Sequence, residues 1–574
     1  MKSSNLLFFH QKDGSMNKKN KYLQKPWLEK YDSHVPKEIK YPESTINTLL
    51  FDAQKKFPLH PFICYQSKEY TYQFIVQKIS ALANNLRHLG IKKGDRVAVI
   101  LPNIPQFIIA YYAILAVGGI VVAMNPKYTQ TELEFLFNQS GVAYVFCLDS
   151  HLDIINLINQ KHKIHTIICT EINDYQYLKK KPSNQNEKLL STREIRFLEL
   201  ISKNIGGVPI ENEIVYPNDP AIFQFSGGTT GVPKAAVGLH RNIIANVFQF
   251  YKWCNLEEGK EVILAAIPLY HVYGMVLAMN MGVAIGAKIV LISDPTDVDY
   301  ILEQIEENQV TFYPGVPTMY HVINNNKSAI KGKRKLDSIK ACISGSFTLH
   351  PQIKKEFEQL TGGKLIEGYG LSEAPTATHC NPLYGMNKTG SIGMPLPDVE
   401  AKIVDLEDGE KILPSGEVGE LIVKGPQVMA GYYMLPDETA LAIRNGWLFT
   451  GDIAKMDEDG YFFLVDRKKS LIKVNGLQVW PNEVEIVINS HPKVKECGIG
   501  GIPDKEHGER VVCWIVPEQE NEISIQEIID WCKPKLAGYK IPSEVILIDK
   551  IPRTGVGKIL RRTLITEYKG KKEV

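Results

Sequence analysis

The sequence predicts an α/β protein, in which a large N-terminal domain of layered α/β subdomains ends in a small β-rich module and is followed by a small C-terminal α/β domain. Three observations predict this: helix-like and strand-like segments alternate, short strand-like runs dominate after residue 400, and the chain has 574 residues. One hydrophobic core rarely supports that length. We therefore expect an N-terminal extension over 1–45, a large domain over 46–466 and a small domain over 467–574.

The alternation starts with an amphipathic helix after Thr71, because apolar residues recur every three or four positions from Ile75 to Leu89 and Gly90 follows. Short apolar runs then predict strands at 96–101, 221–225, 288–292 and 339–343. After residue 400, runs such as AKIVD, GELIVKG and GYFFLVD are broken by Gly, Pro and Asp. These runs predict the strands of the β-rich module.

The uncharged run 107–124 is long enough for a membrane span. However, Gly118 and Gly119 interrupt it, and the β-branched residues 120–122 follow. This pattern predicts a buried helix, a turn and a buried strand, and therefore no membrane span. Contact with a membrane surface is left open by the sequence.

Composition narrows the class of protein. The chain is 44% hydrophobic and 23% charged, as in a soluble globular protein, and its formal net charge of +2 argues against a nucleic-acid partner. Its nine cysteines are scattered, odd in number and without a Cys-x-x-Cys pair. That usage predicts a reducing, cytoplasmic compartment.

A glycine-rich loop, SGGTTGVPK, follows the strand expected at 221–225. Its glycines allow tight turns and close approach to a ligand, while its hydroxyls and lysine suit phosphate oxygens. The candidate phosphate ligands are Ser226, Gly227, Gly228, Thr229, Thr230, Gly231 and Lys234. The common triphosphate loop requires Gly-Lys-Ser/Thr, whereas Val232 and Pro233 precede the lysine here. We expect a helix to continue after Lys234; taken alone, the loop could also be a glycine-rich surface turn.

Seven further motifs follow this loop in order. They are PLYHVYG (268–274), PGVPT (314–318), EGYGLSE (367–373), GSIGMPLP (390–397), GWLFTGD (446–452), VDRKKSLIKVNGLQVWPNEVE (465–485) and TGVGKILRR (554–562). With the loop, they resemble the adenylate-forming superfamily, which includes acyl-CoA synthetases, coumarate-CoA ligases, luciferases and peptide-synthetase adenylation domains. The opening of the chain and the segments SIKACISGSFTL and THCNP look most like bacterial long-chain fatty-acid-CoA ligases.

The resemblance implies that ATP activates a carboxylic acid as an acyl-adenylate, with release of pyrophosphate. Glu373 would ligate Mg²⁺ and Lys558 would stabilise the α-phosphoryl transition state. Besides the loop, the residues expected to bind ATP are Gly345, Tyr369, Gly370, Ser372, Asp452 and Arg467. The family more often has glycine at the position of Ser346. The serine argues against close packing of the backbone at the adenine.

The resemblance also implies transfer of the acyl group to coenzyme A after the small, mobile C-terminal domain rotates about a hinge near Lys469. Lys473, Gly476 and Gln478 would then serve coenzyme A, although Lys473 alone could be an ordinary surface lysine. His271 would lie near the carboxylate. Tyr273 and Met275 are candidates for the acyl pocket, and core packing explains them equally well.

Several functions compete with a fatty-acyl-CoA ligase. An aryl-acid (coumarate-like) CoA ligase or a luciferase-like monooxygenase fits the same motifs. An amino-acid-activating domain needs an acidic residue for the substrate ammonium, and PLYHVYG has none. An enzyme that stops at acyl-AMP is disfavoured by the hinge segment. A non-catalytic nucleotide-binding protein is disfavoured by the presence of Glu373, Asp452 and Lys558.

Overall fold

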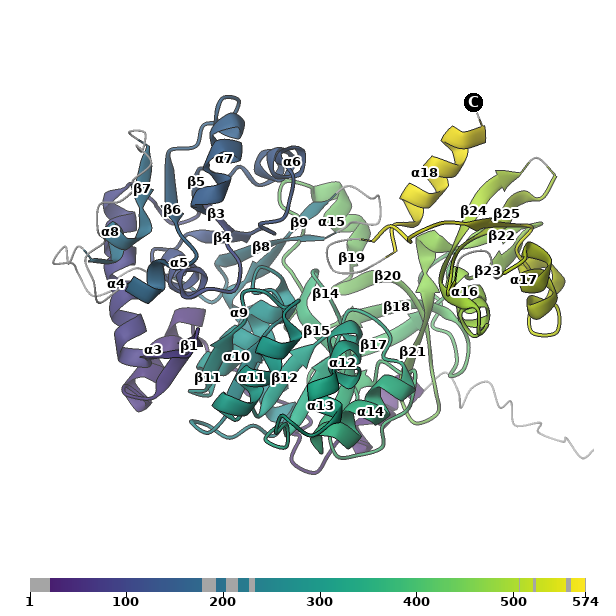
Figure 1. The fold of residues 1–574 in the computed structure, drawn as a ribbon, viewed down its shortest axis with the longest axis horizontal. Helices are drawn as coiled ribbons and strands as arrows, with labels where there is room; N and C mark the ends of the chain where they lie inside the picture. The colour runs from purple at the N-terminus through teal and green to yellow at the C-terminus, as the bar shows by residue number, and fades with distance from the viewer. Residues whose placement is uncertain are drawn as a thin grey trace, which may run out of the picture. The chain divides into compact units, whose positions relative to one another are not determined.

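The computed structural model of the chain describes residues 21–177, 193–202, 215–226, 233–504, 506–519, 523–553 and 559–572. They form two compact units (Figure 1). The large unit comprises Trp27–Glu400 and Val423–Leu448. The small unit comprises Ala401–Ile422 together with the described residues of 21–26 and of the chain after Leu448. The expected boundary between Asp466 and Arg467 stays a prediction.

The large unit contains a nine-stranded sheet in which the central strands are parallel and both edges are antiparallel. Its strands, in spatial order, are β16 (Met394–Pro395), β15 (Ala374–Cys380), β14 (Lys364–Leu371), β13 (Ala341–Ser344), β12 (Phe312–Gly315), β10 (Val262–Ala265), β11 (Lys288–Leu291), β1 (Pro61–Tyr65) and β2 (Lys68–Thr71). Because parallel strands end at the same edge, the loops after β12, β13 and β14 lie together.

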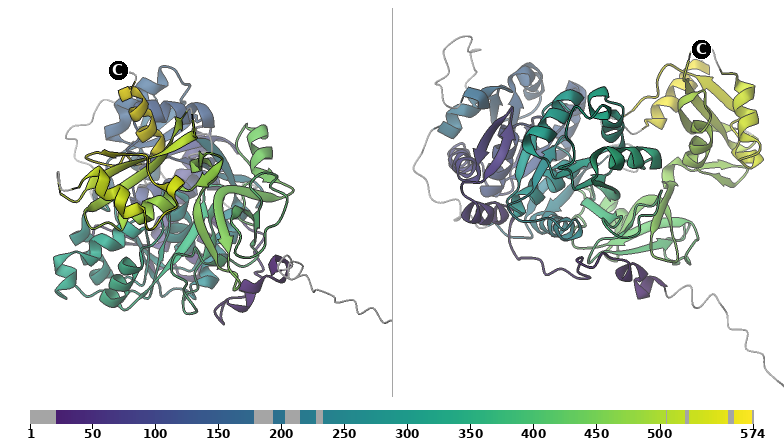
Figure 2. Two further views of the ribbon diagram at one scale, coloured as in Figure 1. Left: turned by 90° about the vertical axis from the view of Figure 1, so that its right-hand side faces the viewer. Right: turned by 60° about the horizontal axis from the view of Figure 1, so that its bottom comes forward.

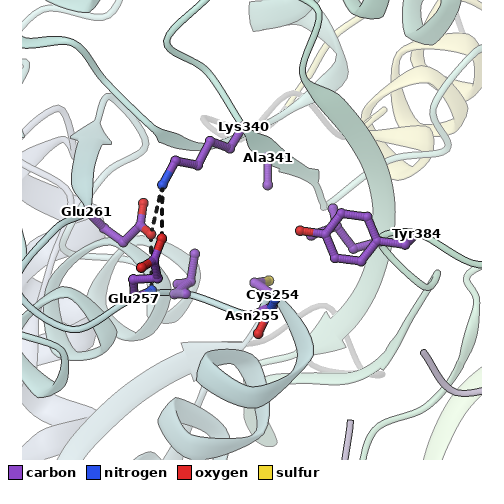
Figure 3. Close-up of a pocket in the computed structure, with 9 residues that line it drawn as sticks. Cys254, Asn255, Glu257, Glu261, Lys340, Ala341 and Tyr384 are labelled. Carbon is purple, nitrogen blue, oxygen red and sulfur yellow. Dashed lines mark hydrogen bonds and ion pairs between the residues drawn. The ribbon is translucent and has the colours of Figure 1, made fainter. Parts of the chain in front are cut away.

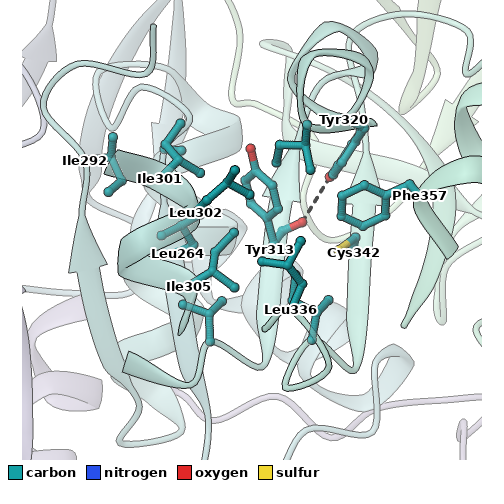
Figure 4. Close-up of a cluster of buried hydrophobic side chains, with 14 of the residues drawn as sticks. Leu264, Ile292, Ile301, Leu302, Ile305, Tyr313, Tyr320, Leu336, Cys342 and Phe357 are labelled. Atoms are coloured by element: carbon teal, nitrogen blue, oxygen red, sulfur yellow. Dashed lines mark hydrogen bonds between the residues drawn. The ribbon is translucent and has the colours of Figure 1, made fainter. Parts of the chain in front are cut away.

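Helices α11 (Val298–Asn308), α12 (Pro317–Asn324), α13 (Lys327–Ile330) and α14 (Pro351–Thr361) cover one face of this sheet (Figure 1). Their apolar side chains form one buried cluster with residues of the strands, among them Leu302, Tyr320, Phe357 and Cys342 (Figure 4). The Tyr320 hydroxyl lies 3.0 Å from the Tyr313 carbonyl oxygen and 2.8 Å from that of Ile343. These contacts fix the strands whose ends carry the site.

A seven-stranded sheet forms the rest of the core of the large unit. Its strands, in spatial order, are β7 (Glu194–Arg196), β6 (Thr166–Thr170), β5 (Tyr144–Leu148), β3 (Arg96–Ile100), β4 (Ile120–Ala123), β8 (Pro220–Ser226) and β9 (Lys234–Leu239). All neighbours are parallel except β8 and β9. The remaining helices of the unit include α3 (Ile46–Lys56), α4 (Tyr72–His88), α5 (Pro105–Ala116), α6 (Gln130–Ser140), α7 (Leu152–Asn159), α8 (Phe197–Ser202), α9 (His240–Trp253), the π-helix η5 (Gly274–Asn280), α10 (Met281–Ala284) and α15 (Pro436–Ala442).

Two predictions from local pattern are confirmed, the helix after Thr71 and the buried helix, turn and strand of the uncharged run. Thr71 caps α4 by accepting a hydrogen bond from the Phe74 amide at 3.3 Å. The uncharged run forms the wholly buried helix α5, a turn at Gly118 and strand β4. Among the described residues, none of the helices combines the length and apolar character that crossing a bilayer requires.

The helix expected directly after Lys234 is wrong. The segment Lys234–Leu239 is strand β9, paired antiparallel with β8 from Ser226↔Lys234 to Pro220↔Leu239. The segment pairs along its whole length with β8, the strand that precedes the loop, so long-range pairing overrides the local pattern. The helix α9 begins only at His240.

The β-rich module predicted after residue 400 is confirmed as a five-stranded sheet. Its strands are β17 (Glu400–Val404), β18 (Gly419–Lys424), β20 (Trp447–Met456), β19 (Ile443–Arg444) and β21 (Phe462–Arg467). The 3-10 turn Lys468–Ser470 follows β21.

The last part of the small unit is an α/β sandwich built on a second five-stranded sheet. The strands are β23 (Leu477–Val479), β22 (Ile472–Val474), β25 (Gly508–Pro517), β24 (Val494–Asp504) and β26 (Glu544–Leu547). Alternate residues of β25 enter two cores: Cys513 packs with α16 (Pro481–Asn489) and α17 (Ile525–Cys532), whereas Trp514 packs with α18 (Arg561–Lys572). Figure 2 shows these helices beside the yellow-green strands.

Candidate active site

The expected adenine-binding residues lie at the carboxyl edge of the nine-stranded sheet. Gly345 directly follows β13, and Tyr369 and Gly370 lie near the end of β14. Open α/β sheets bind ligands at this edge. Position 370 has room only for glycine, because a Cβ there would lie 1.7 Å from the carbonyl oxygen of Thr376.

Tyr273 forms part of the wall behind Gly345. Its hydroxyl lies 2.6 Å from the carbonyl oxygen of Ile343 and 3.1 Å from that of Gly315, at the ends of β13 and β12. A Cβ at position 345 would meet the Tyr273 ring at 3.2 Å. Burial raises the pKa of Tyr273 well above its ordinary value, so it stays neutral. The tyrosine is therefore anchored to the sheet, and its role in an acyl pocket stays a prediction.

Ser346 adopts a left-handed backbone conformation, with φ of +71°. That conformation costs a residue with a Cβ about 1 kcal/mol or more, whereas glycine adopts it freely. This geometry gives a physical reason for the family's preference for glycine at this place. The exposed Ser346 side chain does not close the wall around Gly345.

His271 precedes the π-helix η5, in which Met275 is fully buried. The Tyr273 amide donates a hydrogen bond to His271 Nδ1 at 3.3 Å, which leaves the proton of the neutral ring on Nε2. The Met275 amide donates to the His271 carbonyl oxygen at 2.9 Å. These contacts orient the half-buried imidazole from the first turn of the helix.

The glycine-rich loop joins β8 to β9. Residues Gly227, Gly228, Thr229, Thr230 and Gly231 lie outside the described residues, but the two ends are placed: Ser226 and Lys234 are a paired couple in the β8–β9 hairpin. The Lys234 side chain is only 5% exposed, and its ammonium forms an ion pair with Glu438 of α15. A buried cation therefore stands at the base of the loop.

Tyr432 connects this lysine to Glu373. The Lys234 Nζ lies 5.3 Å from the centre of the Tyr432 ring, and the Tyr432 hydroxyl donates a hydrogen bond to Glu373 Oε1 at 2.9 Å. Burial and the neighbouring Glu373 carboxylate raise the pKa of Tyr432, which keeps its hydroxyl a donor. Ser372 and Glu373 form the turn between β14 and β15, so two sheets meet around one aromatic ring.

Sequence reasoning missed Tyr432 and Glu438. Tyr432 is held by the Ala236↔Tyr432 bridge to β9, and its amide donates to Thr439 Oγ1 at 2.9 Å. A signal was present in the run GYYMLPDET, because Pro436 with two following acids marks the first turn of a helix. Nothing local in that run indicated that the helix would face the loop lysine.

Two more predicted residues meet within the small unit. Asp452 and Arg467 are opposite each other on β20 and β21, and Arg467 Nε lies 2.6 Å from Asp452 Oδ1. The Asp452 side chain is 4% exposed and that of Arg467 is 47% exposed. A buried carboxylate steadied by a half-exposed guanidinium is suited to accept two neighbouring hydroxyls.

The residues expected to serve coenzyme A lie on a tight hairpin. Lys473 and Gln478 are directly opposite on β22 and β23, and both are exposed. Asn475 and Gly476 make the turn with φ of +51° and +79°, as in a two-residue hairpin loop. The Lys473 amide donates to Glu509 Oε2 at 2.8 Å, which fixes the strand while its side chain faces solvent. Lys558 lies outside the described residues.

A pocket of about 240 Å³ lies elsewhere in the large unit, lined by Cys254, Glu261, Lys340 and Tyr384 among others (Figure 3). Glu261 and Lys340 directly precede β10 and β13, so the pocket is at the amino ends of these strands. Lys340 Nζ lies 3.3 Å from Glu261 Oε1. The pocket is thus at the edge opposite to Gly345 and contains none of the predicted site residues.

Metal-binding capacity at the candidate site rests on one carboxylate. Over the residues that the structure describes, no three or more His, Cys, Asp or Glu side chains gather as a metal site. A lone Glu373 fits Mg²⁺, because this ion takes most of its ligands from phosphates and water. His379 and Cys380 are buried in strand β15, and all nine cysteines are buried free thiols.

Together, the carboxyl-edge wall and the Lys234–Tyr432–Glu373 arrangement define an α/β protein with a nucleotide-type site. The chain belongs to the family of AMP-binding enzymes: the model of that family matches residues 50–433, and the model of the AMP-binding enzyme C-terminal domain matches residues 483–558.

Relatives match over almost the whole chain. A long-chain-fatty-acid–CoA ligase of Bacillus subtilis is 38% identical, with 95% of this chain and 98% of the relative covered. A probable 4-coumarate–CoA ligase of Dictyostelium discoideum is 35% identical, with 87% and 90% covered. Among solved structures, ATP-bound MatB from Rhodopseudomonas palustris superposes with a TM-score of 0.80 at 27% identity, covering 92% of this chain and 99% of that one.

Proposed function

We propose that this protein is an ATP-dependent acid–thiol ligase that converts a medium- or long-chain fatty acid to its coenzyme A thioester. The observation that carries the proposal is the arrangement of Lys234 and Glu373 around Tyr432 at the base of the glycine-rich loop. It supplies a cation for phosphate oxygens and a carboxylate for a metal ion in one place. The likeness to long-chain-fatty-acid–CoA ligases over 95% of the chain supports the acid and the thiol.

The first half-reaction joins a carboxylate oxygen to the α-phosphorus of ATP and breaks the bond to pyrophosphate. Charge then builds up on the α-phosphoryl group and on the leaving group, so positioned cations lower the barrier. Lys234 and the loop hydroxyls hold the phosphates, and Lys558 acts on the α-phosphoryl group. Mg²⁺ held by Glu373 would neutralise phosphate charge when bound.

Asp452 supports the nucleotide by accepting hydrogen bonds from the ribose hydroxyls, and the ion pair with Arg467 orients the Asp452 carboxylate. Tyr369, Gly370 and Gly345 provide the wall for the adenine. These roles are consistent with the short Asp452–Arg467 contact and with the absence of space for a Cβ at position 370.

In the second half-reaction the coenzyme A thiolate attacks the acyl carbonyl carbon, and AMP leaves with the bonding electrons of the acyl–oxygen bond. The exposed hairpin of Lys473, Gly476 and Gln478 serves this step. Gly476 adds no side chain to the turn, so a narrow chain such as pantetheine can pass beside it. His271 lies near the carboxylate and controls the approach of the thiol.

The acid is tested by measuring pyrophosphate release with coenzyme A present across medium-chain, long-chain and aromatic acids, with the thioester identified by mass. We expect the fastest release and a thioester with fatty acids. Preference for aromatic acids would favour the aryl-acid ligase that the Dictyostelium relative suggests. Pyrophosphate without thioester, or light emission with oxygen, would contradict the ligase, and no release with any acid would contradict adenylation.

We place the reaction in the cytoplasm, because nine buried free thiols suit a reducing compartment.

A further inference from the structure

Lys234 already has an anionic partner inside the protein. Its ammonium is paired with the Glu438 carboxylate, and its side chain is 5% exposed. The ring of Tyr432 lies on the same ammonium at 5.3 Å, which adds a cation–π contact. The charge of the loop lysine is therefore balanced by protein groups before any phosphate is considered.

Glu438 differs from Lys234 in its freedom to move. Its side chain is 33% exposed, and it projects from the first turn of the short helix α15 (Pro436–Ala442). A carboxylate at such a place can turn to solvent at little desolvation cost, whereas the buried ammonium cannot. Asp437, the neighbouring acid in the same turn, is exposed.

We propose that Glu438 occupies the Lys234 ammonium at the base of the glycine-rich loop when ATP is absent, and competes with the phosphates of ATP for it. The inference rests on the proposed role of Lys234 in ATP binding. A carboxylate and a phosphate oxygen both seek the same ammonium, and two anions at one cation repel each other. ATP binding must therefore displace Glu438, and the affinity for ATP is lower than Lys234 alone would give.

The test is the variant Glu438→Gln, with Asp437→Asn as its matched control. Both remove one negative charge from the same helix turn, but only the first touches Lys234. In acid-dependent ATP–pyrophosphate exchange we expect the KM for ATP to fall about threefold or more in Glu438→Gln with kcat little changed, because the competing anion is gone. Asp437→Asn is expected to leave both values unchanged.

Stability gives a second readout. Without its partner, the buried Lys234 ammonium is left uncompensated, so Glu438→Gln is expected to unfold at a lower temperature than the wild type. ATP then supplies the missing anion, and the increase in Tm on adding ATP is expected to exceed that of the wild type. Glu438→Asp, which keeps the charge on a shorter arm, is expected to give intermediate values and replaces the glutamine variant if that one does not fold.

A raised KM for ATP in Glu438→Gln would overturn the proposal, because Glu438 would then assist ATP binding. Equal KM values and equal ATP-induced Tm increases in wild type, Glu438→Gln and Asp437→Asn would overturn it as well. Calorimetric ATP titration without acid separates this failure from failure of the proposed function. The inference fails if Glu438→Gln does not bind ATP more tightly, whereas the proposed function fails if the wild type shows no acid-dependent exchange.

Discussion

Lys234 and Lys473 have opposite surroundings in the two units. Lys234 is buried, paired with Glu438 and covered by the Tyr432 ring, whereas the Lys473 side chain is exposed on a two-residue hairpin. A buried charge is effective in stabilising phosphate charge, because little water screens it. An exposed one is accessible to a separate, larger substrate. The contrast matches the two half-reactions, of which one needs a preorganised cation and the other an open surface.

This comparison predicts that removing the Lys234 ammonium lowers both the stability and the activity of the protein. Lys234→Met removes the cation and leaves Glu438 and Glu373 near each other. We expect about a hundredfold loss in ATP–pyrophosphate exchange. The free energy of unfolding should fall by about 1–2 kcal/mol. This loss is modest because the Glu438 side chain is one-third exposed. Exchange kinetics and urea unfolding check the two effects.

The matched control is Lys364→Met, which removes an exposed lysine at the start of β14. It is expected to change neither measurement. A Lys234→Met variant that exchanges pyrophosphate at the wild-type rate would break the comparison.

Asp452 is intermediate between the buried Lys234 and the exposed Lys473, because its own side chain is buried but its partner Arg467 is half exposed. Asp452→Asn keeps the shape of the side chain. It loses the negative charge that attracts Arg467 and one of the two oxygens that can accept hydrogen bonds from hydroxyl groups. We expect about a tenfold rise in the KM for ATP with a smaller change in kcat. The exposed Asp549→Asn serves as the control in ATP titrations. An unchanged KM would remove Asp452 from the nucleotide site.

Glu367, a buried acid of β14, is expected to make the stability of the protein depend on pH. Burial raises its pKa to about 8, so the folded protein keeps it protonated over a range in which the unfolded chain, with a pKa near 4.5, has lost the proton. Its contribution to stability is full below pH 4.5 and is lost as pH rises to about 8. The loss is at most about 1.4 kcal/mol per pH unit.

Glu367→Gln copies the neutral acid and cannot ionise. Its free energy of unfolding should therefore fall less than that of the wild type between pH 5 and pH 8 (roughly the range between the two pKa values). Urea unfolding of both proteins at the two pH values measures the difference. Parallel pH profiles would show that Glu367 is not held neutral by the fold.

Features set by neighbouring residues could be predicted from the sequence. The Thr71 cap, the buried helix α5 with its turn at Gly118 and the strands after residue 400 all follow from local pattern. The carboxyl-edge position of Gly345 and Gly370 also follows, once the strands are known to be parallel.

Features set by long-range pairing could not be predicted. Strand β9 could not be told from a helix by its own sequence, because its structure depends on pairing with β8 on the other side of the loop. Glu438 could not be predicted as a partner of Lys234, because 204 positions separate the two residues in the sequence. Tyr432 was missed for the same reason. Its ring connects two sheets that no short motif relates to each other.

The most direct test of the account compares Lys558→Ala with Lys473→Ala in two assays, acid-dependent ATP–pyrophosphate exchange and thioester formation. The exposed Lys495→Ala is the control for loss of a surface lysine. We predict that Lys558→Ala abolishes exchange, while Lys473→Ala exchanges normally and forms thioester about 10–100-fold more slowly. Equal losses in both assays for both variants would contradict the assignment of the two half-reactions to separate lysines.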